Sequence, residues 1–209
     1  MIKKKAESQI YQIHIDGQWS FLDFASFPRT YIQAYSLAYL LSENSQKAIW
    51  AFRAFPWRGG YSAVNFYNAI YRQLPAKHRP QVRRIQYASP GIIELSLLAA
   101  AALSLKTIVS HVLAAARDIS TTYTQIYREL QERKLLRIKT ESARRSLEKE
   151  NIEFINWATK EMARFMGIRS LNELNRLTGS PLVSLKILLS FYRRVRDLGR
   201  FSERKGIEY

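Results

Sequence analysis

The chain has 209 residues and a formal net charge of +16, from 33 Lys and Arg side chains against 17 Asp and Glu. Its apolar fraction of 47% is ordinary for a globular protein and too high for a disordered one. The sequence contains no cysteine, which excludes disulfides, thiolate metal sites and a cysteine nucleophile. This composition is compatible with a reducing cytoplasm.

The basic excess is spread over both halves of the chain. Residues 1–100 carry 12 basic and 5 acidic side chains, and residues 101–209 carry 21 and 12. A charge of this size favours a polyanionic partner such as DNA, RNA or an acidic protein. The alternative is a basic protein that neutralises itself in an oligomer.

Residues 9–24 predict a β-hairpin that turns at Asp16-Gly17. Apolar side chains flank this pair on both sides, and an Asp-Gly pair between alternating apolar runs is the strongest short-range mark of a two-residue turn. Residues 28–41 and 61–74 then have the apolar spacing of helices.

Residues 82–98 predict a second sheet segment. Val82, Ile85 and Tyr87 precede Ser89-Pro90-Gly91, and more β-forming residues follow. Pro-Gly fits the two central positions of a type II turn. The segment is therefore either a second hairpin or one sharply kinked strand.

From about residue 97 onward the sequence predicts only helices. Residues 119–150 read as one long, highly charged helix, which either mediates self-association or forms one arm of a helical hairpin on residues 152–166. The predicted fold is α+β and helix-dominated, with a small antiparallel sheet from two hairpin-like segments and a C-terminal helical bundle. We predict a small α+β domain over 1–98 and a helical domain over 99–209.

The most apolar stretch, residues 91–105, is shorter than the roughly 20 residues that a membrane span needs. The basic N-terminus is not followed by the apolar region of a signal peptide. We therefore expect no stable transmembrane span and a cytoplasmic location. A membrane-acting effector that works through residues 91–105 stays as an alternative.

The sequence carries none of the usual motifs for catalysis or for phosphate and metal binding. It has no GxxxxGK[ST] loop, no GxGxxG and no HExxH, and its three histidines lie far apart. We therefore predict no catalytic residue, no metal ligand and no cofactor. Asp16, Asp23 and Glu94 fall in the two predicted sheet segments, and a paired-carboxylate site among them is a weaker alternative.

Aromatic and basic side chains are interleaved around residue 55, where Trp50, Arg53, Phe55, Trp57 and Arg58 lie close together. Such residues stack on exposed bases and contact phosphates, and they also dominate hot spots between proteins. The aromatic rings can equally fill a core. We predict stacking or interface contacts for the aromatic residues, and phosphate or acidic-partner contacts for the arginines.

The last predicted helix ends in a second basic cluster, Arg193, Arg194, Arg196 and Arg200. We predict that these arginines also contact nucleic acid or an acidic partner. Cations at a helix C-terminus stabilise the helix dipole as well, which requires no ligand.

Two short segments resemble known proteins. Tyr87-Ala88-Ser89-Pro90-Gly91, with the helical region after it, resembles small proteins encoded near bacterial defence systems, which implies an accessory or effector subunit. Arg72 and His78 resemble the RX4–6H signature of HEPN ribonucleases, although Pro75 lies between them.

Taken together, these patterns predict a non-enzymatic binding or assembly subunit within an oligomer or a larger, defence-related complex. The partner is nucleic acid or an acidic protein. The alternative is an enzyme that acts on nucleic acid, such as a ribonuclease, through Arg72, His78, Asp23 and Glu94.

Overall fold

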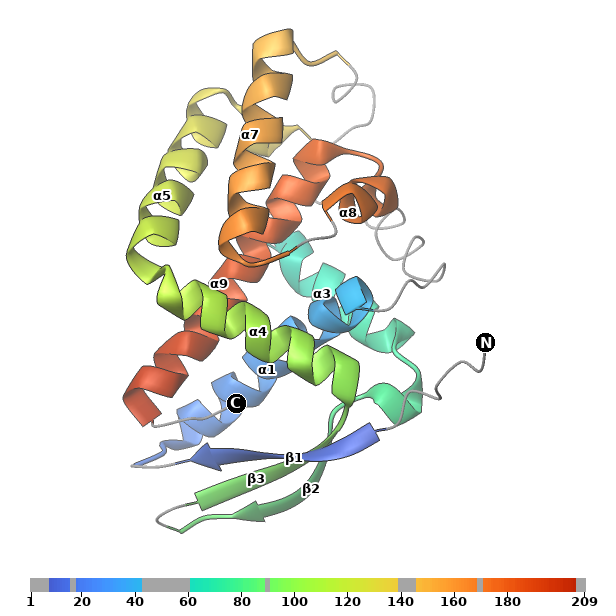
Figure 1. Ribbon diagram of the computed structural model, residues 1–209, viewed down its shortest axis with the longest axis vertical. Coiled ribbons are helices and arrows are strands. Elements are labelled where there is room, and N and C mark those ends of the chain that lie inside the picture. Colours follow the sequence, from blue (N-terminus) through green and yellow to red (C-terminus); the bar gives the residue numbers. More distant parts are fainter. Residues whose placement is uncertain are drawn as a thin grey trace.

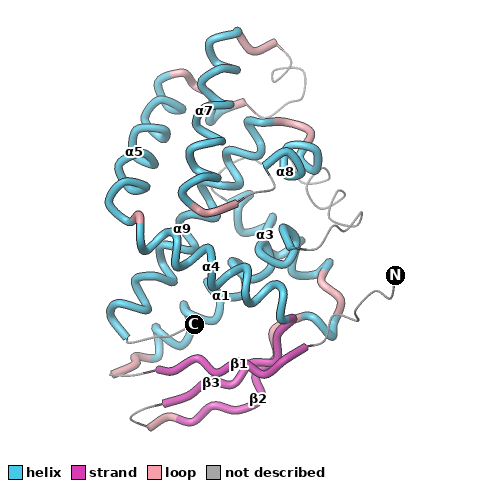
Figure 2. The backbone as a smooth tube through the Cα atoms, in the orientation of Figure 1, coloured by secondary structure: helices cyan, strands magenta, loops and turns pink. Residues whose placement is uncertain are grey.

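A computed structural model describes residues 8–15, 18–42, 61–88, 91–138, 146–168 and 171–205 of the chain (Figures 1 and 2). Helices dominate it, and the three strands lie together beside them, so the predicted α+β class is confirmed. In chain order the elements are β1 (Ser8–Ile15), α1 (Phe21–Ser42), α3 (Tyr61–Gln73), η1 (Ala76–His78), β2 (Gln81–Gln86), β3 (Gly91–Leu98), α4 (Ala99–Ala114), α5 (Ala116–Glu132), η2 (Leu135–Arg137), α7 (Lys149–Phe165), α8 (Leu171–Thr178) and α9 (Pro181–Lys205).

The sheet has the strand order β1-β3-β2, and both pairs are antiparallel. β2 and β3 form the hairpin predicted over residues 82–98. The first residue of β3 needs to be a glycine, because a Cβ on Gly91 would lie 2.8 Å from Cγ1 of Ile15 and 3.0 Å from the carbonyl oxygen of Ala88.

The N-terminal hairpin prediction is wrong, because β1 pairs with β3 and residues 21–24 begin helix α1. A capping box starts this helix: the backbone N–H of Asp23 donates to Oγ of Ser20 at 3.1 Å, and the N–H of Ser20 donates to Oδ2 of Asp23 at 2.9 Å. Trp19 is buried against the rings of Phe27 and Phe201. Asp16 and Gly17 lie outside the described residues.

The predicted single helix over 119–150 is also wrong. Helix α5 ends at Glu132, and Lys134 takes a left-handed backbone conformation with φ of 55°. Leu135 is then buried, because the chain turns back to place it in the core. Helix α7 begins only at Lys149 and packs against α5, so the two helices form a helical hairpin, and a role in self-association stays a prediction.

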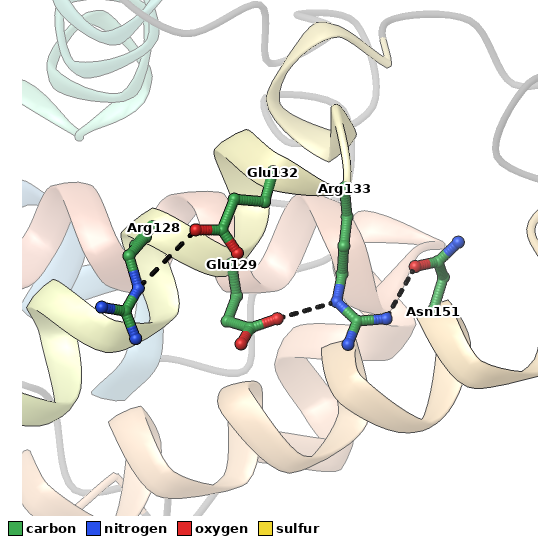
Figure 3. Close-up of polar contacts among 5 residues, drawn as sticks. All are labelled: Arg128, Glu129, Glu132, Arg133 and Asn151. Atoms are coloured by element: carbon green, nitrogen blue, oxygen red, sulfur yellow. Dashed lines mark hydrogen bonds and ion pairs between the residues drawn. The ribbon is translucent and has the colours of Figure 1, made fainter.

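Polar contacts of Arg133 hold the two arms of this hairpin together (Figure 3). Its Nε lies 3.0 Å from Oε2 of Glu129 on the same arm, and its Nη1 donates to Oδ1 of Asn151 on α7 at 3.2 Å. The guanidinium also lies over the ring of Phe154, 5.0 Å from its centroid. Arg128 and Glu132 form a second ion pair on α5, and their side chains are more exposed than those of Arg133 and Glu129.

Helix α9 is the central element of the core. Nearly every side chain from Leu182 to Val195 is buried, and α1, α4, α7 and α8 pack around this helix. Even Lys186 is buried, and its Nζ donates to the carbonyl oxygens of Ile138 at 3.0 Å and Leu136 at 3.3 Å. The predicted division at 98/99 falls at the junction of β3 and α4 and stays a prediction.

In the described part of the chain, no single helix is long and apolar enough to cross a membrane. Helices α4 and α5 meet that requirement only as a pair, and the angle between them is 88°. The apolar stretch 91–105 forms β3 and the first half of α4, whose inward-facing side chains are buried.

Candidate binding surface on the open sheet edge

Strand β2 is an exposed edge of the sheet. It pairs with β3 on one side only among the described residues, and all six of its side chains are exposed. Figure 1 shows it at the edge of the sheet farthest from the helices. An edge strand presents unpaired backbone N–H and C=O groups on which another extended chain can pair. We call residues 81–87, β2 with Tyr87, the open edge.

A β-bulge determines on which face of the sheet each side chain of the open edge lies. Val82 pairs with Leu95 and Arg84 pairs with Glu94, so Arg83 is the extra residue. In a regular strand, Val82 and Ile85 would point to opposite faces, because they are three residues apart. The bulge restores both to the helix-facing side, since their partners Leu95 and Ile93 are buried there.

This apolar row, Val82, Ile85 and Tyr87, is not covered by the helices. The three residues are 58%, 54% and 64% exposed. Tyr87 reaches the start of α1, where its ring lies 6.0 Å from that of Phe24. Phe21 and Leu22, in the same first turn of α1, are also exposed. Exposed apolar patches of this kind mark interaction surfaces.

Within the described part of the chain, the cations on and beside the open edge have no carboxylate partner, although Nη2 of Arg84 donates to Oε1 of Gln86 at 2.6 Å. Lys77, Arg83 and Arg84 are exposed and form no ion pair with any described residue. Glu94 lies opposite Arg84 in the ladder, but its Oε1 accepts a hydrogen bond from Nε2 of Gln12 at 3.0 Å. By contrast, Arg133 at the end of α5, Arg164 on α7 and Arg176 on α8 each pair with a carboxylate three or four residues away.

Buried hydrogen bonds fix the chain just before β2. The hydroxyl of Tyr35 donates to the carbonyl oxygen of His78 at 3.0 Å and accepts from the N–H of Leu98 at 3.0 Å. Oη of Tyr39 lies 2.8 Å from Nδ1 of His78. Burial raises the pKa of Tyr35 to about 12, so this hydroxyl keeps its proton even at about pH 10, where a free tyrosine is half ionised. These bonds tie both β2 and the end of β3 to α1.

Arg79 also fixes the position of the chain just before β2. Its Nε donates to the carbonyl oxygen of Leu74 at 3.1 Å and its Nη2 to that of Arg72 at 3.0 Å, which satisfies the last turn of α3. The guanidinium also lies over the ring of Tyr71. Arg79 is therefore a structural cation, in contrast to Lys77 and the arginines of β2.

Two residues of the enzyme alternative, Asp23 and His78, lie far apart in the structure. His78 is buried beside Tyr39, whereas Arg72 is exposed. Asp23 caps α1, and Tyr35, which contacts His78, lies twelve residues further along that helix, about 18 Å at 1.5 Å per residue. Glu94 lies on the outer sheet face, and Asp16 lies outside the described residues. The described residues hold no group of three or more potential metal ligands.

The predicted aromatic-basic cluster, Trp50, Arg53, Phe55, Trp57 and Arg58, lies outside the described residues, and its roles stay predictions. The cluster on α9 is described.

Three of the four α9 arginines face inward and make intramolecular contacts. Arg193 donates from Nη1 to the hydroxyl of Tyr123 at 3.1 Å. Arg194 donates from Nε to Oε1 of Gln33 and lies over the ring of Tyr67. Arg196 lies over the ring of Tyr192.

The contacts of Arg193 and Arg194 attach α9 to α5, α1 and α3, whereas Arg196 contacts Tyr192 and Asp197 of its own helix. Arg200 is the most exposed of the four, and its Nη1 lies 3.7 Å from Oδ1 of Asp197. Contact of these arginines with a partner stays a prediction.

The cations of the open edge belong to a basic region of the sequence, because residues 44–93 contain eight Lys and Arg residues and no Asp or Glu. That run identifies a basic region. It does not identify the strand edge, which depends on how β2 pairs.

No family model, no curated protein and no solved structure matches this chain.

Proposed function

We propose that this protein is a non-enzymatic binding or assembly subunit that docks an acidic partner on the open edge. One observation supports this most directly: among the described residues, β2 combines an unpaired strand edge, an exposed apolar row and cations without an ion pair. The net charge of +16 adds long-range attraction for such a partner.

A protein partner accounts for more of the open edge than nucleic acid does. Phosphates satisfy Arg83 and Arg84, but they leave Val82 and Ile85 exposed to water. Burial of an aliphatic side chain stabilises an interface by about 1.5–3 kcal/mol when it is complete. The apolar row therefore favours an acidic protein surface.

A competing explanation is that the same residues protect the strand edge from pairing with other chains. Arginines and bulges on an edge strand discourage pairing between copies. That role explains Arg83 and Arg84, but not the retention of three apolar side chains in one row beside the exposed start of α1. A purely protective edge would carry charge on both faces.

The proposal is tested by photo-crosslinking in the native host. A photoreactive phenylalanine analogue replaces Ile85 in one strain and Thr121, an exposed residue of α5, in the control strain. We expect an ultraviolet-dependent adduct with one acidic protein at position 85 and not at 121.

Two results would overturn the proposal. One is the absence of any position-specific adduct at 85. The other is an adduct that nuclease removes, which would assign the open edge to nucleic acid. In a cytoplasmic, defence-related complex, as we propose, the captured protein is another subunit of that complex.

A further inference from the structure

We infer that the partner supplies an extended segment that pairs with β2 as a fourth strand, with acidic and apolar residues at alternate positions. This inference rests on the proposed function of the open edge. It adds the mode of binding and the chemical pattern of the bound segment.

The backbone of β2 favours a strand over other partner structures. All six residues are exposed, and the strand already has extended geometry and a fixed position through the contacts of Tyr35 and Arg79. Strand addition to such an edge provides main-chain hydrogen bonds, while alternate side chains give specificity. A bound segment of six or seven residues covers the strand, about 20 Å at 3.3 Å per residue.

The two faces of β2 set the pattern of the partner. The helix-facing side presents the apolar row, and the outer side presents Arg84 between Gln81 and Gln86. Neighbouring strands place side chains on the same face beside one another. The segment therefore needs apolar residues on the side of Val82 and Ile85, and carboxylates on the side of Arg84.

A second copy of this chain is a poor occupant. Antiparallel pairing of two β2 strands brings the Arg83-Arg84 pairs of both copies together, with no carboxylate on either strand. Like charges directly opposite one another destabilise a sheet. The charge of β2 therefore points to a different, acidic chain.

The experiment uses the full chain and a phage-displayed library of random twelve-residue peptides. Selection on the wild-type protein should enrich peptides in which acidic and apolar residues alternate with a period of two. Addition of a selected peptide should slow amide hydrogen exchange over residues 81–86.

The Ile85→Lys variant separates strand pairing from simple charge attraction. It adds a positive charge but interrupts the apolar row, so a selected peptide should bind it about tenfold or more weakly. Thr121→Lys adds the same charge on α5 and should leave peptide affinity within about twofold. Ile85 is 54% exposed, so the circular dichroism spectrum of its variant should match the wild type.

The inference is overturned if no peptide is enriched, if the enriched peptides lack the period of two, or if Ile85→Lys binds them as tightly as wild type. A protein adduct at position 85 combined with any of these results would retain the proposed function and reject only strand pairing. Absence of the adduct would reject the proposed function itself.

Discussion

Replacing Tyr35 by phenylalanine should destabilise the protein strongly, although it removes only one oxygen atom. The hydroxyl is buried and serves both the N–H of Leu98 and the carbonyl oxygen of His78. In the variant, both backbone groups stay buried without this partner. A buried polar group that loses its hydrogen bond costs about 1–3 kcal/mol.

Two such groups give an expected loss of about 2–6 kcal/mol in the free energy of unfolding. Because domains are stable by only about 5–15 kcal/mol in total, this is a large fraction. Urea unfolding followed by circular dichroism measures it, with an unchanged m-value expected.

Tyr127→Phe is the matched control. Tyr127 is only partly buried, and the variant keeps the ring that stacks on Tyr123, so its stability should stay within about 0.5 kcal/mol of wild type. A Tyr35→Phe protein as stable as that control would refute the role assigned to this hydroxyl.

Three further outcomes follow from the core and from α9. Lys186→Met should lower the free energy of unfolding by about 1–3 kcal/mol in urea titrations, because it leaves the carbonyl oxygens of Leu136 and Ile138 without their buried donor; equal or greater stability would contradict this. Arg194→Ala should destabilise more than Arg200→Ala in thermal unfolding, because only the first is tied to another helix; the reverse order would show that the inward contacts are unimportant. Burial raises the pKa of Tyr67 to about 12, so unfolded chains lose this proton near pH 10 while folded ones keep it. Stability should therefore fall as the pH rises from about 10 to 12, and Tyr67→Phe should make urea midpoints over this range less dependent on pH.

The hairpin of β2 and β3 was predictable because its signals are local. Pro90-Gly91 favours a turn, and β-branched residues lie on both sides of this pair in the sequence. The N-terminal hairpin failed because two local signals compete. Asp16-Gly17 favours a turn between strands, but Ser20 and Asp23 form a capping box that starts a helix three residues later. The capped start of α1 also places Trp19 in the core, and the predicted hairpin does not account for this burial.

The break after α5 could not be predicted from residue types. Arg133 and Lys134 are good helix formers, and the chain turns there because the core has a place for Leu135. The candidate binding surface on the open edge could not be predicted for a related reason. The apolar residues Val82 and Ile85 share one face only because of the bulge at Arg83, and a bulge is defined by pairing with another strand.

The position of α9 has a consequence for how the chain folds during synthesis. Translation delivers roughly 5–20 residues per second, so the elements from β1 to α8 leave the ribosome before the helix that they surround. Until then the apolar faces of α1, α4 and α7 have no common surface to bury against. The core around α9 therefore cannot be completed until this helix has left the ribosome.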